Sequence, residues 1–284
     1  MEEKSNTIQD QDLVYILYDN KKRKWLRKVE SGKQFHTDRG YLDYNDIIGK
    51  EFGSIVLSKP YYNKFFIFKP LPSDIVVNME RASQIIYPED IGLILVYTGI
   101  GPGSIVVEAG TGSGSLTGIL GKYVQPTGHI HTYDVRDSAI KQAKKNMKKL
   151  GVSDFVTIKK GDLLTEVEHT NVDVVVLDLA TPWLAMGKVH GFLKNSGVVC
   201  SFSPVIEQVI KTHAALKENH FHDIKTYELL KREIRVKIDA TRPNSRMIGH
   251  TGYITFARKL DPFVPEREDK KDSTDEKFLF PIDF

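Results

Sequence analysis

The stretch that decides the fold is IVVEAGTGSGSLT, which runs from Ile105 to Thr117. A short run rich in β-branched residues leads to an acid, and a turn with a glycine at every second position follows. A Ser-Leu-Thr step then begins a helix. Strand, glycine turn and helix in this order are the nucleotide-binding opening of a doubly wound α/β domain.

The spacing of the glycines indicates which ligand the turn holds. Dinucleotide dehydrogenases use G-x-G-x-x-G, whereas Gly110, Gly112 and Gly114 give G-x-G-x-G and Ser115 takes the dehydrogenase's third position. A Walker loop needs a lysine, and this turn has none. Glu108, two residues before the glycines, makes the stretch resemble the first motif of class I S-adenosylmethionine-dependent methyltransferases. A glycine-rich turn without a ligand is the alternative.

The composition restricts the class of protein but does not indicate its activity. The 284 residues can bury a full core, and 40% hydrophobic with 27% charged residues is typical of soluble globular proteins. No apolar run is long enough to span a bilayer, and the polar, acidic residues 1–12 do not form a signal peptide. The single cysteine, Cys200, fits a small buried hydrophobe. We therefore predict a cytoplasmic protein, whose net charge of +3 permits a nucleic-acid partner without arguing for one.

The first 77 residues predict a small antiparallel β domain. Between Leu13 and Val77 the chain alternates short apolar runs with turn residues, in LVYILY, KWLRKV, SIVLS and FFIFKP. The basic cluster from Lys21 to Lys24 falls in a hairpin turn. It is either a solvated loop or, beside Trp25 and Phe35, a nucleic-acid contact.

Residues 78–260 predict an α/β domain with an open, mostly parallel seven-stranded sheet. A helical period appears within 78–97, with Pro88 in the first turn. Strands and helices then alternate, with strands at 105–109, 129–135, 155–161, 172–179 and 198–202. Two closing strands, 223–230 and 253–258, are separated by a long polar loop. The charged tail 261–284 is predicted to be disordered, although its apolar end FLFPIDF either docks on a surface or stays free.

Four acids stand at or beside strand ends, where ligands bind in open α/β sheets. They are Glu108, Asp134, Asp162 and Asp178. Asp134 is placed to take ribose hydroxyls, and Asp162 can accept from an adenine amino group. Asp178 begins DLATPW, where methyltransferases of nucleobase nitrogens hold their target-binding loop. Asp178 can also act as a helix N-cap, and both roles are compatible.

Four segments in fixed order resemble the tRNA (adenine-N1)-methyltransferase family, whose members modify adenine 58 of the T-loop and, in some archaea, adenine 57. They are QIIYPED (84–90), VVEAGTGSGSLT (106–117), DLATPW (178–183) and RPNSRMIGHTGYITFARK (242–259). The segment KQFHTDRGYLDYNDIIG (33–49) is similar to the family's small β domain. The resemblance covers nearly everything but the tail, and it leaves open whether adenine 57 is also a target.

The resemblance implies a Rossmann-like class I methyltransferase fold, S-adenosylmethionine as cofactor, and a set of site residues. It makes Asp178 the principal catalytic residue and Tyr87 its neighbour over the target base. Trp183, Arg246, His250 and Thr251 would contact the RNA, although His250 taken alone is a structural turn histidine. The residues implied at the cofactor are Gln84, Glu108, Gly110, Thr111, Gly112, Ser113, Gly114, Ser115, Leu116, Asp134, Val135, Asp162, Leu163 and Asp178.

Two departures from the family pattern bear on these roles. Asp134 stands where glutamate is more usual, so its ribose contact needs a different rotamer or a water. Ala180 stands where proline is common, which loosens the target loop without removing a chemical group. The resemblance also implies either a homotetramer or a heterotetramer with a degenerate sister subunit, and the intact glycine motif and Asp178 favour the homotetramer. We expect it to bind tRNA through basic residues that include Lys21 to Lys24, Arg232, Arg235 and Arg242, with no metal and no membrane partner.

The expected reaction is direct in-line methyl transfer to adenine N1, with the base extruded from the T-loop. Two other functions remain open at this point. One is a methyltransferase of the same fold that acts on protein, as the isoaspartyl repair enzymes do. The other is a non-catalytic RNA-binding subunit, which should have lost its glycines or strand-end acids, although this chain keeps both.

Overall fold

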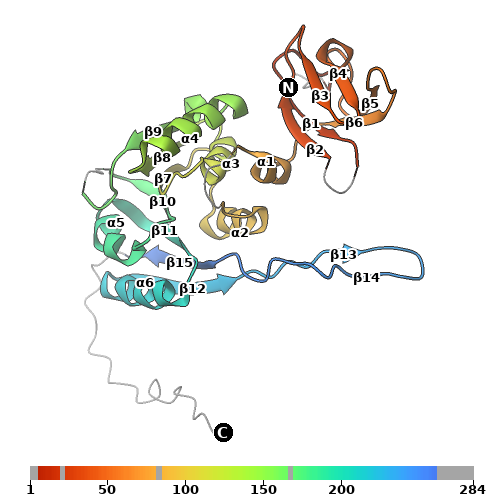
Figure 1. Cartoon of the computed structure of the whole chain (residues 1–284). Helices are drawn as coiled ribbons and strands as arrows, with labels where there is room; N and C mark the ends of the chain where they lie inside the picture. The colour runs from red at the N-terminus through yellow and green to blue at the C-terminus, as the bar shows by residue number, and fades with distance from the viewer. Residues whose placement is uncertain (1–5, 20–22, 81–84, 166–168, 261–284) are drawn as a thin grey trace.

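Two β-sheets of different size organise the chain (Figure 1). The structure is a computed structural model that describes residues 6–19, 23–80, 85–165 and 169–260. The predictions for Lys21, Lys22, Gln84 and the tail 261–284 therefore lie outside the described residues.

The smaller sheet is antiparallel, as predicted, with strand order β2-β1-β6-β5. Alternate residues of its central strand, such as Val14 and Ile16, are fully buried, because a period of two turns one face toward a core. A separate hairpin and a short 3-10 helix close this unit. The elements are β1 (Leu13–Leu17), β2 (Lys24–Lys28), β3 (Gln34–Thr37), β4 (Gly40–Asp43), η1 (Tyr44–Asp46), β5 (Ser54–Leu57) and β6 (Lys64–Phe68).

The larger sheet has the strand order β12-β15-β11-β10-β7-β8-β9, and β15 alone runs antiparallel to its neighbours. This confirms the mostly parallel seven-stranded sheet. The order reverses at β7, so the glycine turn that follows β7 stands at the topological switch point where such sheets bind ligands. The strands are β7 (Ile105–Ala109), β8 (His129–Asp134), β9 (Val156–Lys160), β10 (Val172–Leu177), β11 (Leu193–Ser203), β12 (Phe221–Glu228) and β15 (Tyr253–Lys259).

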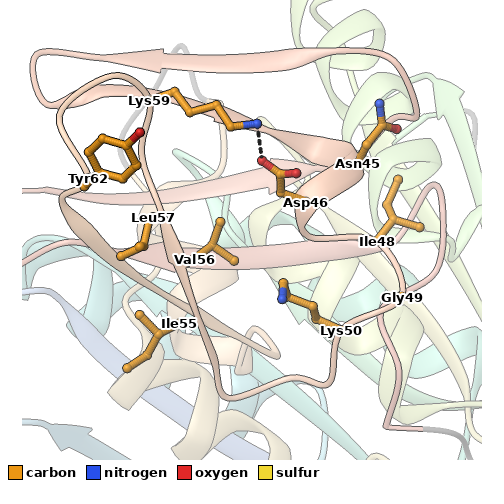
Figure 2. Close-up of a pocket in the computed structure, with 10 residues that line it drawn as sticks. All are labelled: Asn45, Asp46, Ile48, Gly49, Lys50, Ile55, Val56, Leu57, Lys59 and Tyr62. Atoms are coloured by element: carbon orange, nitrogen blue, oxygen red, sulfur yellow. Dashed lines mark ion pairs between the residues drawn. The ribbon is translucent and has the colours of Figure 1, made fainter.

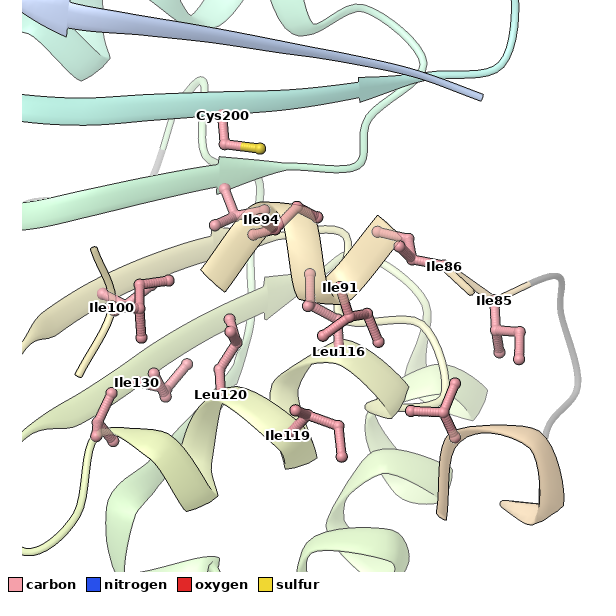
Figure 3. Close-up of a cluster of buried hydrophobic side chains, with 14 of the residues drawn as sticks. Ile85, Ile86, Ile91, Ile94, Ile100, Leu116, Ile119, Leu120, Ile130 and Cys200 are labelled. Carbon is pink, nitrogen blue, oxygen red and sulfur yellow. The ribbon is translucent and has the colours of Figure 1, made fainter. Parts of the chain in front are cut away.

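Helices cover both faces of this sheet, so its central strands are apolar on both sides. On β7, Val106 joins a cluster with α2 and α3, whereas Val107 joins one with α5 and α6. In the first cluster Ile91 of α2 lies close to Leu116 of α3 (Figure 3). The helices are α1 (Pro72–Asn78), α2 (Pro88–Thr98), α3 (Ser115–Tyr123), α4 (Asp137–Leu150), η2 (Ser153–Phe155), η3 (Pro182–Ala185), α5 (Met186–Phe192) and α6 (Ile206–Glu218).

The sequence analysis missed α1 and the β3–β4 hairpin. Residues 72–77 were expected to belong to the β unit, but Pro72 occupies the first helical turn and Asp74 accepts a hydrogen bond from Leu71 N at 2.9 Å. These two features favour a helix start over a strand. In the hairpin each strand has only four residues, too few to show a clear alternation.

The long polar loop expected before β15 is instead an arm that projects from the sheet (Figure 1). Its strands β13 (Ile234–Arg235) and β14 (Arg242–Pro243) pair antiparallel. The turn between them is closed by Thr241, whose Oγ1 donates to Lys237 O at 2.9 Å. Two-residue strands carry no periodic signal, which is why the sequence did not reveal them.

Within the described ranges, no helix combines the length and apolar character needed to cross a membrane.

Candidate active site

The glycine turn after β7 has a shape that only glycine allows at its first position. Gly110 has φ +97°, and a Cβ placed there would lie 2.1 Å from the carbonyl oxygen of Asp178. The N–H groups of Gly110 and Thr111 both donate to Tyr133 O, at 2.9 and 3.1 Å, and Asp178 N donates to Ala109 O at 2.8 Å. The turn therefore ties the ends of β8, β7 and β10 together.

A cavity of about 220 Å³ lies above this turn. Besides the turn, its walls include Ile85 and Ile86, which precede α2, and Arg136, which follows β8. The sequence analysis missed these three. The predicted residues that line it are Glu108, Gly110, Thr111, Gly112, Ser113, Ser115, Leu116 and Asp178.

Two carboxyl groups of this cavity have raised pKa values. Glu108 is 1% exposed, and burial raises its pKa to about 7 although Thr117 Oγ1 donates to it at 2.5 Å. Desolvation raises the pKa of Asp178 to about 6, while the positive charge of Arg136 opposes this shift. Asp178 is an exposed residue that lines the cavity, so its raised pKa reflects the protein atoms packed around the carboxyl rather than complete exclusion of solvent. Raised pKa values at a cleft are typical of functional sites.

Asp134, at the end of β8, is held differently. Its carboxylate accepts from Gly112 N at 2.9 Å and from the Arg136 backbone and guanidinium at 2.9–3.0 Å. Desolvation would raise the pKa of Asp134, but these hydrogen bonds outweigh it and keep the pKa below its usual value. Arg136 escaped the sequence analysis because an arginine after a strand end is a common surface residue. Its position two residues beyond the acid was the available signal.

One buried polar atom in the cavity wall is evidence for a ligand-binding site. The Ser115 hydroxyl is buried and has no hydrogen-bond partner among the described residues. Leaving such a group unpaired is unfavourable. With Glu108 and Asp178 nearby, the site suits a ligand that carries polar groups and positive charge. This donor set fits S-adenosylmethionine, whose sulfonium and amino acid ammonium are both positively charged.

Other predicted cofactor residues lie outside the cavity lining. Asp162 follows β9 and accepts from Leu164 N at 2.9 Å, while Leu163 is buried and Val135 is exposed. Tyr87 is the N-cap of α2 and directly follows Ile86, which lines the cavity. The N-cap role considered for Asp178 is not observed, because Thr181 caps η3.

The residues assigned to the RNA side lie near the base of the arm or along it. Thr251 Oγ1 donates to Asp90 Oδ1 at 3.2 Å, which links this segment to the first turn of α2. His250 contacts Pro204 O at 2.9 Å and Glu228 Oε1 at 2.7 Å, and these contacts, Pro204 first, raise its pKa. They give His250 a structural role in the turn. Arg246 is exposed on the arm.

Trp183 lies in η3, five residues after Asp178. The Lys211 ammonium of α6 stands 5.0 Å from the centroid of one Trp183 ring. This cation–π contact holds the indole at the start of the segment that follows β10.

A second cavity lies elsewhere, on the small sheet (Figure 2). Its volume is about 620 Å³, and its walls include Ile55, Leu57 and Tyr62 together with an ion pair of Lys59 and Asp46 at 2.7 Å. It contains neither a glycine turn nor a group of strand-end acids, so we place the chemistry in the smaller cavity. Within the described ranges no group of three or more His, Cys, Asp or Glu side chains can hold a metal ion.

Comparison with known proteins identifies the family of the chain. The family described as tRNA methyltransferase complex GCD14 subunit matches residues 64–241, and the TrmI-like N-terminal family matches 13–56. The tRNA (adenine(57)-N(1)/adenine(58)-N(1))-methyltransferase TrmI of Methanocaldococcus jannaschii is 38% identical, over 90% of this chain and 98% of its own length.

Two solved structures resemble most of the chain. The tRNA (m1A58) methyltransferase TrmI from Aquifex aeolicus is 28% identical with a TM-score of 0.75, covering 90% of this chain and all of its own. A structure described as a SAM-dependent O-methyltransferase from Thermotoga maritima is 30% identical with a TM-score of 0.83, covering 92% of this chain and 97% of its own.

Proposed function

This chain belongs to the tRNA (adenine-N1)-methyltransferase family, and we propose that Asp178 orients adenine 58 of the tRNA T-loop for direct methylation at N1. The chain is an S-adenosylmethionine-dependent tRNA methyltransferase. The observation that carries the assignment of roles is the shared cavity of the glycine turn, Glu108 and Asp178. Because the relatives are tRNA methyltransferases, a protein substrate and a non-catalytic subunit are not favoured.

The cofactor S-adenosylmethionine supplies an electrophilic methyl group on a positively charged sulfur. We assign the glycine turn to the methionine end, where the backbone must approach closely. Asp134 would take the ribose hydroxyls, and the second carboxylate oxygen of Asp162 the adenine amino group. Glu108 and the unpaired Ser115 hydroxyl border the same cavity.

The role of Asp178 follows from the chemistry of adenine. N1 carries a lone pair and no proton at neutral pH, so the enzyme needs no general base before N1 attacks. The base would gain positive charge as the N1–C bond forms, while the S–C bond to the methyl group breaks and its electron pair stays on sulfur as a neutral thioether. The Asp178 carboxylate can accept from the exocyclic amine, orient N1 and stabilise that charge, so catalysis rests on positioning and electrostatics. With a pKa of about 6, the carboxyl is mostly ionised at pH 7.

The target adenine must leave its T-loop stack before it can reach this cavity. We propose that Tyr87, which follows the cavity residues Ile85 and Ile86, supplies an aromatic surface for the extruded base. Its position at the N-cap of α2 places it on a short connection close to the cavity wall.

We also propose that the protein is a homotetramer that binds tRNA with more than one subunit. Val236 and Ile238, two apolar side chains of the arm, are 80% and 88% exposed, and contact with a second subunit would bury them. Arg232, Arg235 and Arg242 lie on the same arm. Sedimentation that shows a monomer at micromolar concentration would contradict the assembly. A cytoplasmic location stays a prediction from the sequence.

The decisive experiment measures methyl transfer to an unmodified tRNA transcript and maps the product by reverse-transcription arrest. We expect an arrest at adenine 58, and the arrest position also shows whether adenine 57 is modified. Asp178→Ala should lower turnover by orders of magnitude and leave cofactor binding within a few-fold. The control is Asp137→Asn, an exposed carboxylate paired with Lys160 at 2.8 Å, which should keep wild-type turnover. Equal loss of turnover and cofactor binding in Asp178→Ala would refute the assigned role.

A further inference from the structure

The carboxylate of Asp134 is saturated with hydrogen bonds from this chain. Its Oδ1 accepts from Arg136 N at 2.9 Å and from Arg136 Nε at 3.0 Å. Its Oδ2 accepts from Gly112 N at 2.9 Å and from Arg136 Nη2 at 3.0 Å. A carboxylate offers about four lone-pair sites, so the residue assigned to the ribose has no acceptor site left.

A ribose diol can therefore bind Asp134 only if donors of the protein leave. Gly112 N belongs to the glycine turn, and Arg136 N belongs to the N-cap residue of α4, so both are held by the backbone. The Arg136 side chain is 56% exposed, whereas that of Asp134 is 3% exposed. The guanidinium is the donor that can move, and its two hydrogen bonds are the two that a diol would replace.

A displaced guanidinium stays charged and needs an anion. The carboxylate residue Asp178 lines the same cavity as Arg136, but in the proposed reaction Asp178 is engaged with the base and cannot serve as that anion. A tRNA substrate carries a phosphate group on each side of the target adenine, and the planar fork of arginine matches a phosphate with two hydrogen bonds.

We propose that Arg136 is a positioning residue under the control of the cofactor. The ribose of the bound cofactor displaces the guanidinium from Asp134, and the freed guanidinium binds a phosphate next to the target adenine. This inference rests on the proposed tRNA substrate. It makes cofactor binding and RNA binding mutually favourable, since a coupling of two binding sites is reciprocal.

The first test needs no RNA. The variant Arg136→Gln removes the competitor of the ribose while both backbone donors to Asp134 remain. Calorimetry with S-adenosylhomocysteine should show binding several-fold tighter than in the wild type. Weaker binding would overturn the proposal, because Arg136 would then only orient Asp134. The control Lys160→Gln removes a cation at the end of the neighbouring strand β9 and should leave this affinity unchanged.

The second test measures tRNA binding with and without S-adenosylhomocysteine. In the wild type the nucleoside should tighten tRNA binding by about fivefold or more. It should also steepen the dependence of log K on log salt by about 0.7–0.9, the value for one added phosphate contact. In Arg136→Gln both effects should vanish, and Arg136→Lys should restore part of them.

Each outcome of these two tests has one meaning. A coupling that survives in Arg136→Gln, or that is absent from the wild type, would overturn the proposal. A protein that binds S-adenosylhomocysteine as predicted but does not bind tRNA would refute the proposed substrate instead. Melting curves of the variants, which should match the wild type, exclude a folding defect.

Discussion

Replacing Gly110 by alanine tests how the glycine turn and Asp178, the proposed catalytic residue, depend on each other. The added Cβ would lie 2.1 Å from Asp178 O, 2.9 Å from Asp178 C and 3.2 Å from Asp178 Cβ. An ordinary contact needs roughly 3.4 Å or more, so the backbone at Asp178 must move by about 1 Å. A misplacement of this size near the reacting groups can lower turnover about a hundredfold.

The stability effect of Gly110→Ala has two parts. A non-glycine residue in a left-handed conformation costs about 1–2 kcal/mol, and overpacking adds about 1–3 kcal/mol. The variant Gly151→Ala separates these two contributions to the loss of stability. Gly151 has φ +67°, and a Cβ at this position meets no atom within 4 Å. Gly151→Ala should therefore show the conformational part alone, about 1–2 kcal/mol, with normal turnover.

Urea unfolding and single-turnover methylation of both variants check this reasoning. Gly110→Ala should unfold at a lower urea concentration than Gly151→Ala, bind S-adenosylhomocysteine more weakly and turn over about a hundredfold more slowly. If Gly110→Ala matched Gly151→Ala in both unfolding and turnover, the close approach of the turn to Asp178 would not matter, and the argument would fail.

Three further predictions concern protons. Since the Asp178 carboxylate must be ionised and its pKa is about 6, single-turnover rates should fall tenfold per pH unit below pH 6, and Asp178→Asn should abolish this dependence. Burial raises the pKa of Glu108 to about 7, so its contribution to stability is lost as pH rises from about 4.5 through 7. Glu108→Gln should flatten this decline in urea midpoints, and a slope equal to the wild type's would contradict the assignment. Burial, with the nearby His169 and His129, lowers the pKa of His131 to about 4. The contribution of His131 to the free energy of unfolding is present above pH 6.5 and is lost on acidification toward pH 4, by as much as about 3 kcal/mol. A His131→Asn variant with the same loss of stability in acid as the wild type would refute this.

Much of the site was predictable because its signals are local in the chain. The glycine spacing indicated the class of ligand, and the acids at or beside the ends of β7, β8 and β10 were expected at one edge of the sheet. Glu108 and Asp178 line one cavity, and Asp134 binds Gly112 of the turn. These results follow from topology, since parallel strands bring their carboxyl ends to the same edge.

Other features depend on contacts that no local pattern encodes. Ile85 and Ile86 have the composition of core residues, and only packing shows that they border the cavity. The link from Thr251 to Asp90 spans 161 positions of the chain. The sequence did not predict the projecting arm, because strands of two residues show no periodicity.

The sequence by itself determined the sheet, the glycine turn and the placement of the strand-end acids, because hydrophobic period and glycine conformation act over a few neighbouring residues. The tertiary structure decided how those acids are occupied. Asp134 accepts hydrogen bonds from the guanidinium of Arg136, two residues away, and the buried Glu108 accepts one from Thr117. Asp178 lines the cavity. Burial and hydrogen bonding set the protonation and availability of a carboxylate, and both depend on the packing of the whole chain.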